Sequence, residues 1–286
     1  QNYYFIFCIV KALERPVLMS SFPIIMAAPN GARKIKTDHP NLPITITETV
    51  DVACRCFDAG ASILHAHIRD DKGQHSLDSY RYGELLNQMA KTVPDMLVQI
   101  TTESAGIFTP KQQATCLLEV QPPFASVGVR EMTGNGDEKS LAFAADIYAR
   151  VNAQGTSIQH IVYSPDDLDF LIALKQQRII PDGKLHALLV LGRYNPGFVS
   201  DSAELDGFFG KNLNTLDSWM LCAFGASEYD SITKAIEHGG HGRIGFENNM
   251  YLRDGSLASC TSDLIRQITD HMQTAKGEDT ASILTQ

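Results

Sequence analysis

The sequence predicts an α/β fold, a closed (β/α)8 barrel of the TIM type. Short runs rich in Ile, Val and Leu alternate along the chain with longer amphipathic stretches, which is typical of βαβ units and a parallel sheet. Eight runs of each kind within about 260 residues match this barrel in number and size. A doubly wound open sheet is the main alternative, but no G-x-G-x-x-G turn follows the first strand.

The expected strands are the apolar runs, and the expected helices are the amphipathic stretches between them. Strands are predicted at residues 23–28, 62–69, 96–102, 124–129, 157–164, 185–192, 217–225 and 242–248. Helices are predicted at residues 46–59, 79–93, 110–120, 141–154, 166–176, 203–211, 228–238 and 262–274. Two of these helices begin with clear signals: Thr45 and Glu48 have the spacing of a capping box, and Ser164 precedes Pro165.

We expect residues 22–286 to form a single domain, because no low-complexity segment or linker-like break interrupts them. Residues 1–21 are expected to be an N-terminal extension. Gln1 is not a translation start, so we expect a natural start at Met19 and an extension that is either foreign to the natural chain or a cap on the fold. Its apolar run at residues 3–10 is too short to span a bilayer and lacks the basic flank of a signal peptide.

The composition, 44% hydrophobic and 20% charged residues, is that of an ordinary soluble protein. A net charge of −9 without any basic run argues against a nucleic-acid partner, and no apolar stretch is long enough to predict a membrane partner. None of the six cysteines forms a C-x-x-C pair, so we expect free thiols in a reducing compartment and a cytoplasmic location.

Two histidines interrupt the second apolar run. His65 and His67 are two residues apart, so on a strand their side chains share one face. Imidazole is the commonest metal ligand in proteins, and a catalytic zinc needs three protein ligands and an open position. The pair therefore predicts two ligands of one metal ion; the alternative is two polar residues at a strand end, each hydrogen-bonded locally.

The eighth predicted strand offers the third ligand. Arg243 and Glu247 are four residues apart and would lie on one strand face. In a closed barrel the second and eighth strands flank the first, so Glu247 is predicted to complete a His2Glu site with the two histidines. Alternatively, Arg243 is simply a buried salt-bridge partner of Glu247.

Four stretches resemble a known family: P-N-G-A-R-K (29–34), T-D-H-P-N-L-P-I-T (37–45), A-G-A-S-I-L-H-A-H-I-R-D (59–70) and R-I-G-F-E-N-N (243–249). In this order, and over residues 22–275, they are similar to the β-keto acid cleavage enzymes, formerly a domain of unknown function, with the 3-keto-5-aminohexanoate cleavage enzyme as prototype. The resemblance implies a TIM barrel and a zinc ion, Zn²⁺, held by His65, His67 and Glu247. It also implies a Claisen-type exchange in which a β-keto acid and acetyl-CoA give acetoacetate and a new acyl-CoA.

The resemblance implies further roles. Zinc would be a Lewis acid that stabilises the enolate of the β-keto acid. The family's substrate-contacting hydroxyls fall on Thr101, with Thr102 beside it, and on Ser126, and its strand-8 arginine falls on Arg243. Family members are homo-oligomers, so a homotetramer or homodimer is expected. The CoA groove is expected over the loop around residues 193–197.

The chain departs from the prototype at Asn248, where the prototype has an aspartate that tunes the neighbouring arginine for proton abstraction. An amide supplies no negative charge, and arginine stays protonated in proteins, so an Arg–Asp dyad is unavailable. Either Glu103, at the end of the third strand, is the base, or zinc lowers the pKa of the substrate enough for a weak base.

A second departure is Arg33, which aligns with the prototype's glutamate for the substrate amino group. A cation there argues against an amino-bearing substrate and favours a carboxylate or another polar tail, which a guanidinium binds through two hydrogen bonds. Alternatively, Arg33 pairs with Glu103, Glu131 or a CoA phosphate. Two other functions are possible from the sequence. One is a metal-dependent barrel hydrolase, which is disfavoured because Glu247-Asn248-Asn249 stands where such enzymes have an aspartate base. The other is a non-catalytic ligand-binding relative of the family.

Overall fold

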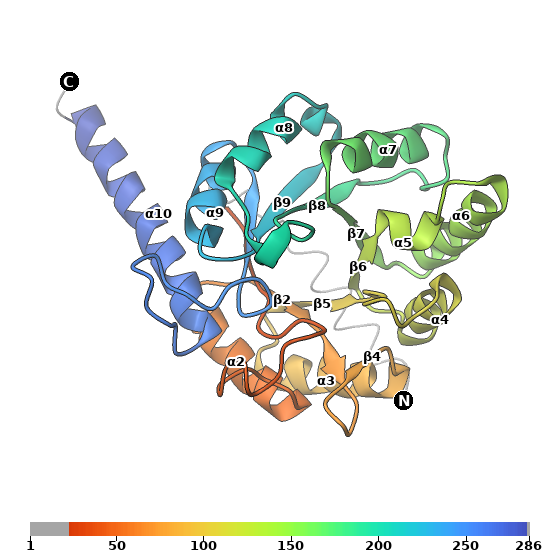
Figure 1. The fold of residues 1–286 in the computed structure, drawn as a ribbon, viewed down its shortest axis with the longest axis horizontal. Helices are drawn as coiled ribbons and strands as arrows, with labels where there is room; N and C mark the ends of the chain where they lie inside the picture. The colour runs from red at the N-terminus through yellow and green to blue at the C-terminus, as the bar shows by residue number, and fades with distance from the viewer. Residues whose placement is uncertain (1–22, 285–286) are drawn as a thin grey trace.

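The computed structural model describes residues 23–284, and the side chains of residues 23–274. Its main sheet closes on itself in the order β1-β10-β9-β8-β7-β6-β5-β2 with every pair parallel, which confirms the predicted barrel (Figure 1). The barrel strands are β1 (Ile25–Ala27), β2 (Ile63–Ala66), β5 (Leu97–Thr101), β6 (Phe124–Gly128), β7 (Ser157–Val162), β8 (His186–Leu191), β9 (Ser218–Ala223) and β10 (His241–Ile244).

Helices surround the barrel (Figure 1). They are α2 (Ile46–Asp58), α3 (Ser79–Thr92), α4 (Pro110–Val120), α5 (Val129–Thr133), α6 (Glu138–Ala153), α7 (Pro165–Gln176), α8 (Asp206–Phe209), α9 (Glu228–Glu237) and α10 (Thr261–Leu284). The capping box of Thr45 and Glu48 is present at α2, and the Ser164 side chain accepts a hydrogen bond at the start of α7. The predicted 203–211 helix is the short α8 preceded by a 3-10 turn, Ser202–Leu205.

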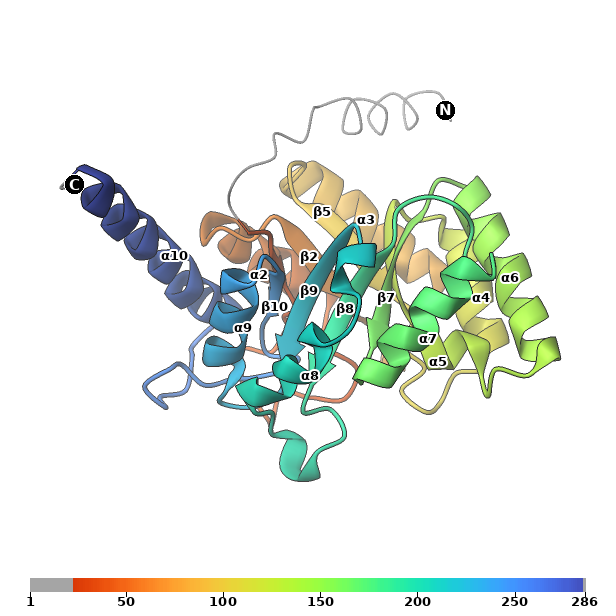
Figure 2. The same cartoon turned by 90° about the horizontal axis from the view of Figure 1, so that it is seen from above.

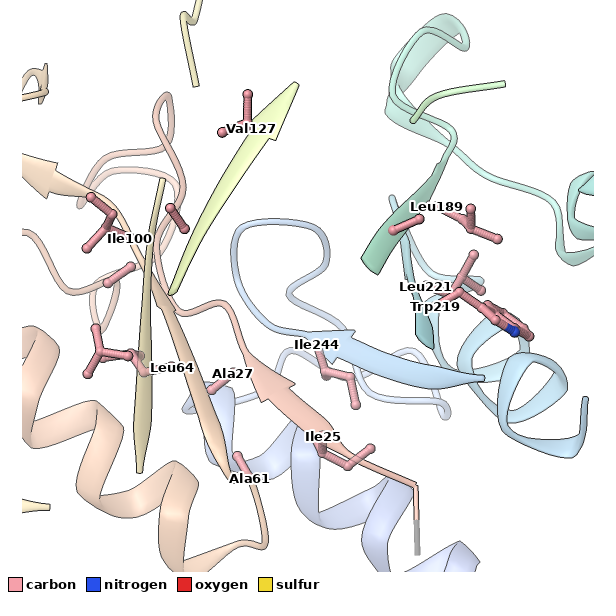
Figure 3. Packing of buried hydrophobic residues seen from close by; sticks show 14 of the residues in the cluster. Ile25, Ala27, Ala61, Leu64, Ile100, Val127, Leu189, Trp219, Leu221 and Ile244 are labelled. Atoms are coloured by element: carbon pink, nitrogen blue, oxygen red, sulfur yellow. The ribbon is translucent and has the colours of Figure 1, made fainter. Parts of the chain in front are cut away.

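The alternation of side chains along the strands produces two hydrophobic cores. One face packs against the helices, and Figure 3 shows members of this cluster such as Leu64, Ile100 and Leu221. The opposite face holds a separate cluster that includes Met26 and Leu188. Polar residues take the same face as this second cluster toward the carboxyl ends of the strands, and this arrangement leaves the functional groups at one end of the barrel.

The structure corrects two strand predictions next to the predicted metal ligands. β10 ends at Ile244, so Glu247 lies in the turn after the strand and not on it. The second predicted strand is divided: β2 ends at Ala66, and β3 (Ile68–Arg69) pairs with β4 (His75–Ser76) in an unpredicted antiparallel hairpin. The break has a local cause, because the Asn30 side chain binds both the N–H and the C=O of His67.

The predicted extension at residues 1–21 lies outside the described residues. Within residues 23–284, no helix combines the length and the apolar character needed to cross a membrane. The cytoplasmic location, the homo-oligomeric state and the single-domain division stay predictions.

Candidate active site

A cavity of about 340 Å³ opens at the carboxyl ends of the barrel strands. Its lining includes residues from the ends of β2, β5, β7, β8 and β10 and from the loops that follow β1 and β10. Among the predicted site residues, those lining it are Arg33, His65, His67, Thr101, Glu103, Arg243, Glu247 and Asn248.

Three side chains meet on the cavity floor as predicted. The Nε2 atoms of His65 and His67 are 3.2 Å apart, and Glu247 Oε2 lies 3.4 Å from the first and 3.6 Å from the second. Both histidines are 1% exposed. Among the described residues, these three form the cluster that brings potential metal-ligand atoms within 4.8 Å of one another.

The donor set fits a zinc ion. Tetrahedral zinc with ligand bonds of 2.0–2.2 Å places neighbouring ligand atoms about 3.3–3.6 Å apart, close to the separations seen here. Glu247 Oε2 is buried without a hydrogen-bond partner among the described residues, and a metal ion would satisfy it. Burial lowers the pKa of His65 to about 3, so its imidazole is neutral near pH 7, as a ligand must be.

A buried polar chain fixes the orientation of His65. Its Nδ1 lies 2.7 Å from Gln99 Oε1, and the Gln99 amide donates to Gln159 Oε1 at 3.0 Å. Because an amide oxygen only accepts, Nδ1 of His65 carries the proton and Nε2 offers its lone pair to the cavity. Gln99 was not among the predicted site residues, although it lies two positions before Thr101 and therefore on the same strand face.

The backbone around β1 and β10 places the Glu247 carboxylate. Gly31, with φ +74°, follows Asn30, and a Cβ at this position would lie 2.6 Å from Glu247 Cγ, so only glycine permits this approach. Lys34 Nζ donates to the carbonyls of Phe246 and Glu247 at 2.7 and 2.9 Å. These contacts hold the turn that follows β10 and carries Glu247.

Glu228, at the start of α9, supports the same turn from behind. Its fully buried carboxylate accepts from Gly245 N–H and from the Asn249 amide, each at 3.2 Å. Burial raises the pKa of Glu228 to about 8. Glu228 does not line the cavity, so its part is to hold the turn that carries Glu247.

Arg243 is buried beside the Glu247 carboxylate and binds it directly. Its guanidinium donates to Glu247 Oε1 at 3.0 Å, to Cys222 Sγ at 3.2 Å and to Asn248 Oδ1 at 3.4 Å. Burial opposes the charge, but Cys222 and Glu247 raise the pKa of Arg243 above its ordinary value. Burial by itself would raise the pKa of Glu247, but the neighbouring Arg243 and His65 hold this pKa well below its ordinary value. Arg243 is therefore a permanent cation and Glu247 a permanent anion.

Glu103 lies between the floor and the mouth of the cavity. One of its oxygens is 3.9 Å from His67 Nε2, and the other accepts from Arg33 at 2.7 Å and lies 3.7 Å from Arg193. The unpredicted hairpin contributes here, because His75 Nε2 donates to the Glu103 carbonyl at 2.9 Å. Of the alternatives for Arg33, the structure contains the pair with Glu103.

The three predicted hydroxyl residues differ in position. Thr101 lines the cavity, and its Oγ1 accepts from Glu103 N–H at 3.1 Å. Ser126 pairs with Thr101 in strand register and has a buried hydroxyl without a partner among residues 23–274. Thr102 does not line the cavity, because its hydroxyl donates to the Ser126 carbonyl and its own carbonyl accepts from Gln113 of α4.

His160, another histidine of the barrel strands, is buried and does not line the cavity. Its ring packs edge-on against Tyr148 of α6 at 5.3 Å between centroids. Its neighbours on β7, Gln159 and Ile161, take the opposite face, so strand alternation turns His160 toward the helices.

Comparisons with known proteins agree with this geometry. The family model described as "beta-keto acid cleavage enzyme" matches residues 23–282. The 3-keto-5-aminohexanoate cleavage enzyme of Acetoanaerobium sticklandii is 28% identical over 250 residues, which cover 86% of this chain and 89% of the relative. The 3-oxoadipate:acetyl-CoA acetyltransferase of Cupriavidus necator is 27% identical and covers 86% of each chain.

Solved structures support the barrel alone. The apo structure of ObcA aligns with a TM-score of 0.66 at 16% identity over 83% of this chain and 63% of that chain. A type I 3-dehydroquinate dehydratase from Clostridium difficile aligns with a TM-score of 0.55 at 7% identity over 86% of this chain and 92% of that chain. At these identities the likeness concerns the fold.

Proposed function

The chain belongs to the beta-keto acid cleavage enzyme family, and from this premise we propose that it exchanges the acyl group of a β-keto acid with that of acetyl-CoA, using one bound zinc ion. It is an acyltransferase with a β-keto acid and acetyl-CoA as its substrates. The proposed products are acetoacetate and a new acyl-CoA. The convergence of His65, His67 and Glu247 beside Arg243 on the cavity floor carries this proposal.

The metal would be held by His65 and His67 through Nε2 and by Glu247 through Oε2. When bound, zinc supplies Lewis-acid polarisation to the keto and carboxylate oxygens of the β-keto acid. Gln99 keeps the His65 lone pair directed at this position, and Asn30 holds the His67 backbone. The chain thus offers a site whose ligands are oriented before any ion arrives.

Glu103 is the proposed base. It lines the cavity and is a carboxylate close to the ligand cluster, whereas Arg243 keeps its proton and Asn248 cannot accept one as a base. Arg243 and Asn248 are proposed to stabilise and orient charge, because the Arg243 guanidinium donates to Glu247 and to the side-chain oxygen Oδ1 of Asn248. Thr101 is proposed to contact the β-keto acid from β5, whereas Ser126, its register partner on β6, does not line the cavity.

The proposed reaction begins at C2 of the β-keto acid. Glu103 takes a proton from C2 of the β-keto acid, and C2 forms a bond to the carbonyl carbon of acetyl-CoA while the CoA thiolate leaves. The thiolate then attacks the original keto carbon, and the bond from that carbon to C2 breaks. C2 regains the proton from Glu103, which gives acetoacetate and the new acyl-CoA.

The test is an assay of purified, zinc-loaded protein with acetyl-CoA and a panel of β-keto acids. We expect acetoacetate and the matching acyl-CoA to form in equal amounts, with both measured by mass spectrometry. Cleavage that proceeds without acetyl-CoA would overturn the proposal in favour of a metal-dependent hydrolase. Binding without any product across the panel would contradict turnover itself.

The substrate is proposed to lack an amino group and to carry an anionic or polar tail. Two arginines, Arg33 and Arg193, line the cavity near its mouth, and the acid between them, Glu103, is already paired with Arg33. A positively charged tail would meet two guanidinium groups there, whereas an anionic tail would be attracted.

A further inference from the structure

Arg193 is an unusual cation in this cavity. Its side chain is 15% exposed, and within residues 23–274 its guanidinium donates no hydrogen bond to the protein. Its ion-pair partner, Glu103 Oε1, is 3.7 Å away, too far for a hydrogen bond. Five N–H donors thus lie in a recess of the cavity wall without protein acceptors.

Aromatic rings hold this guanidinium in place. Its carbon lies 5.3 Å from the centroid of Phe198 and 5.6 Å from that of Phe224, distances at which the ring faces attract a cation. Phe198 has φ +53°, a conformation that costs energy for a residue with a side chain. The arrangement orients Arg193 without using its hydrogen-bond donors.

The loop that carries Arg193 and Phe198 is fastened at both ends. Ser200 N–H donates to Phe224 O at 2.8 Å, and the Asn195 amide donates to Val199 O at 3.0 Å and to Glu204 at 2.9 Å. Figure 2 shows the segment after β8 projecting beyond the end of the barrel toward which the β8 and β9 arrows point. Arg193 is therefore oriented in advance at the end where the cavity opens.

Arg33, by contrast, is already engaged. Its guanidinium donates to Glu103 at 2.7 Å, and its side chain is 49% exposed. Around the mouth, Arg33 and Arg193 together carry two positive charges against the single negative charge of Glu103. One further anion would balance the group, and the free donors of Arg193 are available to receive it.

We propose that Arg193 binds the distal carboxylate of the substrate, which makes the substrate a short β-keto dicarboxylic acid; this inference rests on the proposed function. The first carboxylate and the keto group would lie at the ligand cluster on the floor. Glu103 lies 3.9 Å from His67 Nε2 through one carboxylate oxygen and 3.7 Å from Arg193 through the other, so a short chain spans the distance. The planar guanidinium fork suits a carboxylate through two parallel hydrogen bonds.

The test compares 3-oxoadipate with 3-oxohexanoate, which share a carbon skeleton and differ by the terminal carboxylate. We expect the wild-type protein to prefer the diacid in kcat/KM, and Arg193→Gln to reduce that preference roughly 10- to 100-fold, the value of hydrogen bonds to a charged group. Arg193→Lys keeps the positive charge but not the paired N–H donors of the guanidinium, so it should reduce the preference for the diacid by a smaller factor. The matched control is Arg130→Gln, an arginine outside the cavity that is also stacked on a ring, 4.0 Å from Phe170, and should leave the preference unchanged.

A binding measurement separates this inference from the reaction. Calorimetry with adipate and hexanoate, neither of which can react, should show tighter binding of adipate to the wild type and loss of that difference in Arg193→Gln. If the protein shows no turnover but still binds adipate more tightly than hexanoate, the proposed function is wrong, whereas the role of Arg193 in carboxylate binding still holds. A diacid preference that survives Arg193→Gln but is lost in Arg33→Gln would overturn the inference, as would a raised KM for acetyl-CoA with the acid preference unchanged.

Discussion

The floor and the mouth of the cavity are built differently. On the floor, His65, His67 and Glu247 are held in a buried network in which the Gln99 amide accepts from His65, Asn30 binds the His67 backbone and the Arg243 guanidinium donates to Glu247. At the mouth, Arg33 and Glu103 hold each other by charge, and Arg193 rests on aromatic rings. The floor groups cannot change without loss of a buried network, whereas the mouth groups can change with little effect on the floor.

This difference indicates a division of labour. Under the proposed function, the floor would supply the chemistry that any β-keto acid needs, and the mouth would recognise what distinguishes one β-keto acid from another. The names of the relatives agree with such a division, since the Acetoanaerobium sticklandii enzyme is named for an amino-bearing keto acid and the Cupriavidus necator enzyme for a dicarboxylic one. The following experiments test whether floor and mouth are separable.

The largest effect is expected from His65→Ala. Removal of one of three ligands should abolish stoichiometric zinc binding and reduce kcat at least about 1,000-fold, since charge stabilisation by the metal is worth several kcal/mol. Metal content per chain, measured by mass spectrometry, and kcat are the readouts. His160→Ala is the control, because it removes another buried barrel histidine that lies outside the cavity and should retain zinc. Full zinc occupancy in His65→Ala would refute the ligand assignment.

A smaller effect is expected from Glu103→Gln, which lies at the junction of the two regions. Loss of a general base should lower kcat about 100- to 10,000-fold, while zinc content stays at one per chain. Because Gln cannot pair with Arg33 by charge, KM for the β-keto acid should also change, but by far less than kcat. Nearly unchanged kcat would exclude Glu103 as the base and leave the metal-lowered pKa of the substrate as the explanation.

The smallest effect is expected from Gln99→Leu, because Gln99 contacts the floor residue His65 and not the substrate. This change removes the acceptor that fixes the tautomer of His65, and partners of this kind contribute about 10- to 100-fold in metal affinity. Competition with a zinc chelator measures the affinity. Preference between diacid and monoacid should not change, and a shift in that preference would show that floor and mouth are coupled.

Much of this architecture could be predicted along the chain. The alternation of apolar and amphipathic runs is local information, and it predicted the barrel and most strand positions, while the spacing of Thr45 and Glu48 predicted the capping box of α2. The spacing of His65 and His67 likewise predicted a shared face, because side chains on a strand repeat every second residue. The closed order, with β1 between β2 and β10, brings the carboxyl ends of these strands together, but Glu247 lies in the turn after β10 and not on the strand as predicted.

What could not be predicted depends on contacts between distant residues. Asn30 ends β2 at Ala66 by taking the backbone groups of His67, and Gly31 admits Glu247 from a turn instead of a strand. The sequence by itself determined the barrel and the residue types that meet at its open end, since periodicity and spacing are properties of short segments. Only the tertiary structure decided that Arg33 is hydrogen-bonded to Glu103 while Arg193 lies 3.7 Å from the same carboxylate, beyond hydrogen-bond distance, because a guanidinium's partners depend on which strand ends lie side by side once the barrel has closed.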